Sequence, residues 1–284
     1  MVEVIEHTLL EAIKLLPFLF LAYLLMEYIE HKTKDKTKDI VKKSGEWGPF
    51  FGALLGIFPQ CGFSAAAANL YAGRIITLGT LMAVFLSTSD EMLPILISEA
   101  APIGLILKII GIKFIIGTVL GFVVDLIYRT IKKNNKKEEI EDAIGSICEK
   151  EHCGCEHGIL KPAIKHTINI LVFIILITFT INILIHFIGK DKISNFIASV
   201  PFVGILASAL VGLIPNCAGS VIITELYLNN LITLGSMIAG LLVGSGIGIL
   251  VLFKSNKNVK ENINITLILY LISVTCGFII DLFI

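Results

Sequence analysis

Gly56-Ile57-Phe58-Pro59-Gln60-Cys61-Gly62-Phe63-Ser64 is a short polar interruption within a long apolar run. Pro59 has no amide hydrogen, so it cannot continue a helix without losing a backbone hydrogen bond. Helix-breaking backbone at membrane depth is tolerated only where it is buried in protein or lines a water-filled cavity. The stretch therefore indicates a site inside a membrane protein.

The same interruption returns 156 positions later as Gly212-Leu213-Ile214-Pro215-Asn216-Cys217-Ala218-Gly219-Ser220. The agreement extends further, because Ile76-Thr77-Leu78-Gly79 matches Ile232-Thr233-Leu234-Gly235 at the same offset. Apolar composition alone does not produce shared proline, cysteine and serine positions. The chain is therefore predicted to be an internal repeat.

The composition indicates a polytopic, all-α membrane protein. The 284 residues are 55% hydrophobic and 16% charged, the mean hydropathy is +0.87, and several apolar runs reach the length of about 20 residues that crosses a bilayer. We expect a first membrane repeat over residues 1–128, a cytoplasmic polar loop over 129–163 and a second membrane repeat over 164–284.

Two topologies are consistent with this pattern. If each interrupted segment forms a broken re-entrant hairpin, each half has three spans plus one hairpin, and the second half is an inverted repeat of the first. The Lys-rich side is then cytoplasmic, which places both termini outside the plasma membrane of a prokaryote and Lys108 and Lys113 near a membrane boundary. In the alternative, each interrupted segment is one discontinuous span.

The two interruptions carry matching polar side chains. Inverted hairpins would bring them together near the midplane, where such transporters keep their substrate. Thiols favour soft or borderline ions, and amide and hydroxyl oxygens suit harder ones. Alternatively, each cysteine is simply a small buried residue. The predicted substrate-binding side chains at the interruptions are Gln60, Cys61, Ser64, Asn216, Cys217 and Ser220.

A second polar run, Ser87-Thr88-Ser89-Asp90-Glu91, interrupts another apolar segment. Carboxylates inside a membrane are costly and usually functional, so Ser89, Asp90 and Glu91 are predicted to bind substrate, and the two acids to bind a metal ion or carry a coupled proton. The alternative is that the helix ends here in water. Asp125 and Asp281 recur in register, and we expect both to be wetted helix ends.

The polar loop contains a group of soft and borderline metal ligands. Such a composition is typical of metal binding, although its spacing fits no standard zinc finger. We expect either a capture or regulatory site for the transported metal or a simple linker. The residues are Cys148, His152, Cys153, Cys155 and His157.

No phosphate-binding loop and no phosphorylated-aspartate motif occurs in the sequence, so direct use of ATP is not expected. The glycine-rich stretch 244–248 lies in an apolar segment and indicates close helix packing instead. We expect no enzyme activity, no cofactor and no nucleic-acid partner. The partners are then the lipid bilayer and the transported ion, while the oligomeric state is left open.

At these residues the chain resembles the ten-transmembrane heavy-metal exporter family, whose members are also described as manganese transporters and arsenic-efflux-like permeases. The motifs that carry the resemblance include Tyr23-Leu24-Leu25-Met26-Glu27-Tyr28, Pro59-Gln60-Cys61-Gly62-Phe63-Ser64, Phe85-Leu86-Ser87-Thr88-Ser89-Asp90-Glu91 and Lys165-His166-Thr167. Ten hydrophobic segments also result here if each hairpin counts as two. The resemblance implies export of a metal or metalloid.

Together these observations predict a secondary transporter that exports a transition-metal ion of the manganese type, or a heavy-metal or metalloid ion, by alternating access. A permease for a neutral or anionic arsenic or sulfur species is the first alternative, and it would use the thiols without the acids. A membrane metal sensor that acts through the Cys/His loop is the second.

Overall fold

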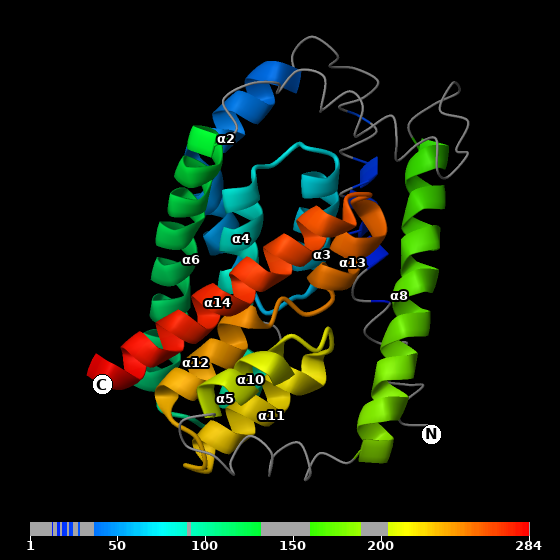
Figure 1. The fold of residues 1–284 in the computed structure, drawn as a ribbon. Coiled ribbons are helices and arrows are strands. Elements are labelled where there is room, and N and C mark those ends of the chain that lie inside the picture. Colours follow the sequence, from blue (N-terminus) through cyan, green and yellow to red (C-terminus); the bar gives the residue numbers. More distant parts are fainter. Residues whose placement is uncertain are drawn as a thin grey trace.

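The structure is a computed structural model of an all-helical protein (Figure 1). It describes part of the segment 13–28, then residues 37–89, 92–131, 160–188 and 204–283, with some side chains within these ranges left out. No β-strand occurs in the described ranges. The first half contains α2 (Thr37–Gly56), α3 (Gly62–Ala72), α4 (Leu78–Ser87), α5 (Met92–Ser98) and α6 (Ile103–Ile131). After α8 (Leu160–Ile188), the second half contains α10 (Gly204–Gly212), α11 (Cys217–Leu228), α12 (Leu234–Val243), α13 (Gly248–Ser255) and α14 (Val259–Phe283).

The elements of the two halves follow one another in the same order at the offset seen in the sequence. Leu78 and Leu234 begin α4 and α12, Met92 and Gly248 begin α5 and α13, and both pairs are 156 residues apart. Within the halves, α4 packs between α2 and α6, and α12 packs in the same way between α10 and α14. The predicted repeat is therefore also a repeat of helices and of their packing.

Contacts between the halves are reciprocal. Helix α3 packs against α13, and its counterpart α11 packs against α5; likewise α4 contacts α14 while α12 contacts α6. A two-fold relation produces such exchanged pairs, because each surface meets the counterpart of its own partner. In Figure 1, α6 rises from bottom to top, whereas α14 descends from upper right to lower left.

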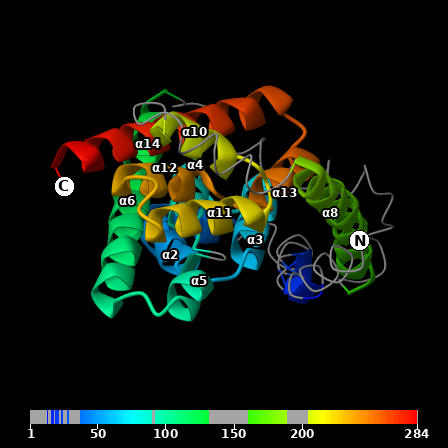
Figure 2. The same cartoon turned by 90° about the horizontal axis from the view of Figure 1, so that it is seen from below.

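Five segments among the described residues are long and apolar enough to cross a membrane: 78–98, 103–128, 163–181, 234–255 and 259–283. The first and fourth are mostly buried inside the protein, while less than a third of each of the other three is buried. Helix α8, for example, exposes Ile164, Ile168, Val172 and Leu176 at four-residue intervals, which form one apolar stripe. Figure 2 shows α6 and α8 at opposite edges of the bundle.

Matching polar clamps fix the starts of α4 and α12. In the first half, the Asp125 carboxylate accepts hydrogen bonds from Thr77 Oγ1 (2.6 Å) and Gly79 N (2.8 Å). In the second half, Asp281 accepts from Thr233 Oγ1 (2.5 Å) and Gly235 N (2.7 Å). Asp281 is exposed, but Asp125 is only 5% exposed. The expectation of a wetted helix end is therefore wrong for Asp125, because its carboxylate satisfies the first turn of α4.

The difference in burial between the two clamps gives a prediction. We expect Asp125→Ala to lower the stability of the purified protein by about 2 kcal/mol, because it leaves the donors of the first clamp without an acceptor. Asp281→Ala should cost about 1 kcal/mol or less, because water can replace an exposed acceptor. The melting temperatures of the two variants in detergent provide the measurement. Equal losses for both variants would contradict this account of the clamps.

Candidate functional site

Four helix breaks interrupt the bundle, two of them partly exposed and two of them mostly buried. The predicted pair separates α2 from α3 at residues 57–61 and α10 from α11 at 213–216. A second pair separates α4 from α5 at 88–91 and α12 from α13 at 244–247. In the sequence, the second pair was marked by the polar run Ser87–Glu91 and by the glycines around Ser245. One of these glycines, Gly246, has a positive φ of 54°. The stretch 244–248 is therefore a helix break as well as a packing contact.

Three of the breaks are in close contact. A Cβ atom added to Gly56, at the end of α2, would lie 2.1 Å from the Oγ of Ser87, at the end of α4. A Cβ added to Gly248, at the start of α13, would lie 2.8 Å from Phe85 Cε1 and 2.9 Å from Ser64 Cβ. Only glycine permits these approaches. The 57–61 break thus lies against the α4 break of its own half and the α13 start of the other half.

Lys113 of α6 reaches this region from the side. Its side chain is 1% exposed. Its ammonium group donates hydrogen bonds to the carbonyl oxygen of Thr88, and to that of Leu241 at 2.8 Å. Lys113 was expected near a membrane boundary; it is the eleventh of the 29 residues of α6 and is buried, away from both ends of that helix. Its position in an apolar run was the available signal, because such charges usually face the protein interior.

Several of the predicted binding side chains bond to the backbone at the breaks. Buried Ser64 donates to the carbonyl oxygen of Cys61 at 2.8 Å, and buried Ser89 donates to that of Ser87 at 3.0 Å. The Oδ1 of buried Asn216 accepts from Ala218 N at 2.7 Å and so caps α11. These residues hold the shape of the breaks, whatever else they bind.

Other predicted residues have less defined environments. Gln60, Cys61 and Ser220 are partly buried, and Cys61 packs against the edge of the main core. Asp90, Glu91 and the side chain of Cys217 lie outside the described residues, and so does the whole Cys148–His157 cluster. Within the described part of the chain, no three His, Cys, Asp or Glu side chains are grouped as metal ligands. Metal binding at the paired thiols therefore stays a prediction.

The model of one protein family matches residues 8–188, and its description reads "Putative, 10TM heavy-metal exporter". The chain belongs to this heavy-metal exporter family. The matched range covers well over half of the chain and includes the 57–61 and 88–91 breaks and Lys113. No curated protein and no solved structure gives a significant match. The resemblance drawn from the sequence motifs is thus confirmed.

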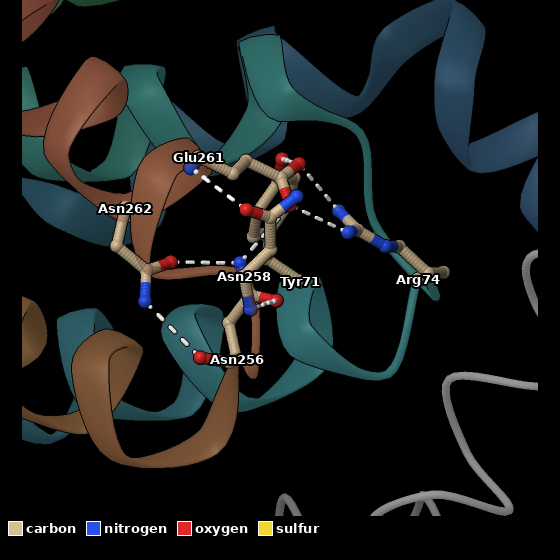
Figure 3. Close-up of polar contacts among 6 residues, drawn as sticks. All are labelled: Tyr71, Arg74, Asn256, Asn258, Glu261 and Asn262. Atoms are coloured by element: carbon tan, nitrogen blue, oxygen red, sulfur yellow. Dashed lines mark hydrogen bonds and ion pairs between the residues drawn. The ribbon is translucent and has the colours of Figure 1, made fainter.

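This exporter-family chain also has a charged cluster between its halves, drawn in Figure 3. Arg74 donates from Nη1 and Nη2 to the two carboxylate oxygens of Glu261, at 2.8 and 2.7 Å. Tyr71 donates its hydroxyl to the same carboxylate at 2.5 Å, and Asn256 adds a longer contact at 3.2 Å. We call Tyr71, Arg74, Asn256 and Glu261 the Glu261 cluster. It ties the end of α3 to the start of α14.

The Glu261 cluster has no charged counterpart in the other half. Arg74 and Asn230 are equivalent and share a left-handed backbone, with φ of 58° and 57°, but the position equivalent to Glu261 is Leu105. Burial by itself would lower the pKa of Arg74, but the hydrogen bond to Glu261 and the negative charges beside the guanidinium together raise that pKa above its usual value. The guanidinium therefore stays charged, and a two-point ion pair fastens α3 to α14 on this side of the bundle.

The contact between Gly248 and Ser64 can be tested by one methyl group. We expect Gly248→Ala to destabilise the protein by about 2 kcal/mol, because the added carbon overlaps buried Phe85 and the Ser64 backbone. Gly111→Ala in α6 is the control, since a Cβ there meets nothing within 4 Å and alanine stabilises a helix by about 1 kcal/mol. Melting temperatures in detergent provide the comparison. A Gly248→Ala protein as stable as the control would show that the halves do not meet as described.

Proposed function

We propose that this protein is a secondary transporter that exports a transition-metal, heavy-metal or metalloid ion by alternating access. The observation that carries the proposal is that four helix breaks interrupt the bundle and that close contacts join three of them, since the 57–61 break meets the end of α4 and the start of α13. Broken helices at the midplane are where many secondary transporters bind substrate and coupling ions. A purely structural bundle has no use for such breaks, since every interrupted turn leaves backbone groups without partners.

The side chains near the breaks suggest the kind of ion. Cys61 and Cys217 would offer thiolates to a soft or borderline ion, while Gln60, Asp90 and Glu91 would offer oxygens to a harder, manganese-type ion. Asp90 and Glu91 would also be able to exchange a proton for the metal. Cys61 is partly buried, so a modest opening of the bundle would expose it.

An inverted repeat would supply the two states that alternating access needs. The reciprocal packing of the halves and the opposite directions of α6 and α14 in Figure 1 support this arrangement. The Glu261 cluster would close the bundle on the side of Arg74, which would be the cytoplasmic side if the Lys-rich segments face the cytoplasm. Its uncharged counterpart around Asn230 and Leu105 would make the opposite side easier to open.

Export can be tested in cells with variants of two half-buried cysteines. We expect cells that lack the protein to retain several-fold more of at least one element among Mn, Fe, Zn and As. Wild-type protein and Cys276→Ala should restore normal content, whereas Cys61→Ala should not, because Cys61 lies at a break and Cys276 lies within α14. Elemental analysis of washed cells gives the readout.

Two outcomes would count against the proposal. An unchanged content of all four elements would refute export. Full rescue by Cys61→Ala would show that the Cys61 thiol does not bind the transported ion. Asp90→Asn, at comparable expression, separates the kinds of substrate: a cation exporter should lose activity, and a permease for neutral arsenic species should keep it. Deletion of residues 148–157 should leave most of the flux intact unless the protein is a sensor.

A further inference from the structure

The ammonium group of Lys113 lies where two helices of different halves end. Helix α4 ends at Ser87 with Thr88 as its C-cap, and α12 ends at Val243 with Gly244 as its C-cap. The carbonyl oxygens of the last helical turn have no amide partner within their own helix. In α12, the amide of Ser245 turns to the carbonyl of Val243 at 2.8 Å instead of that of Leu241. The Leu241 carbonyl oxygen therefore lacks this helical partner, and it accepts a hydrogen bond from Lys113 instead.

This environment is suited to a monovalent cation. Each helix C-terminus carries about half of a negative elementary charge, so two such ends favour a positive charge beside them. Backbone carbonyl oxygens of broken helices are also the ligands with which transporters coordinate sodium ions. A lysine ammonium is a compact point charge, and here its stem enters from α6 and delivers that charge to both carbonyls.

The site occurs once, although the chain is a repeat. The residue equivalent to Lys113 is Leu269, which is fully buried and apolar. The two acceptors are not equivalent to each other either, since Leu241 corresponds to Phe85 and Thr88 to Gly244. A single charge therefore bridges the two halves at their contact. Its removal would take this positive charge away from the carbonyls of both halves.

We propose that the Lys113 ammonium is a tethered substitute for a coupling cation, bound at a monovalent-cation site formed by the carbonyl oxygens of Thr88 and Leu241. The proposal rests on the transport function, because it implies that export runs without sodium or potassium as the coupling ion. It also implies that shortening Lys113 uncovers the site and makes the protein depend on a free monovalent cation.

The test compares three proteins purified in detergent at full length: wild type, Lys113→Ala and Lys113→Met. Each is melted in chloride salts of lithium, sodium, potassium, ammonium and methylammonium, with choline as the control for ionic strength. We expect at least one small cation to raise the melting temperature of Lys113→Ala by about 5 °C relative to choline. Wild type should not respond because its own ammonium fills the site, and Lys113→Met should not respond because its side chain fills the space.

Lys113→Ser is measured in parallel in case the alanine variant does not fold, because the serine hydroxyl keeps one hydrogen-bond donor at this position. Equal behaviour in every salt and in choline, for both small variants, would overturn the proposal. So would failure of both to fold in all of these salts, or an equal response of Lys113→Met, which would place the cation elsewhere. This test measures stability and not transport. If the protein transports no metal, the proposed function fails, but the cation-dependent melting of the Lys113 variants still decides the present proposal.

Discussion

Unpaired backbone groups at helix ends are the constraint on which this structure depends. A helix that crosses a bilayer satisfies its own amides and carbonyls, but a helix that stops inside does not. Here four breaks impose this cost, and different groups offset it. Ser64 donates to a carbonyl of the 57–61 break, Asn216 caps α11, and Lys113 bonds to the ends of α4 and α12.

The two halves share their architecture but not their charges. The aspartate clamps of Asp125 and Asp281 are nearly identical, and they fix α4 and α12 in the same way. Lys113 and the Arg74–Glu261 pair occur in one copy each. A strictly symmetric bundle would have equal energies with either end open. These two features have no counterpart in the other half, so they would remove that equality, and they are where the direction and coupling of transport would be set.

The sequence predicted the features that local chemistry determines. Pro59 and Pro215 marked two breaks, and the matched residues around them revealed the repeat that the helices follow. The second pair of breaks was harder to predict, because no proline lies within Ser87–Glu91 or Val243–Ile247. The burial of Asp125 and of Lys113 depends on how α6 packs against its neighbours, which one sequence does not encode locally.

The central claim is that the breaks surround a space that opens to each side of the membrane in turn. Ser245 lies at the 244–247 break, is 1% exposed, and its hydroxyl has no hydrogen-bond partner among the described residues. The direct measurement is the labelling of Ser245→Cys by a membrane-impermeant thiol reagent, added to either side of oriented vesicles. The reference is the same protein without the added cysteine. The account predicts additional labelling from both sides, slowed by the transported ion. No additional labelling from either side would contradict it.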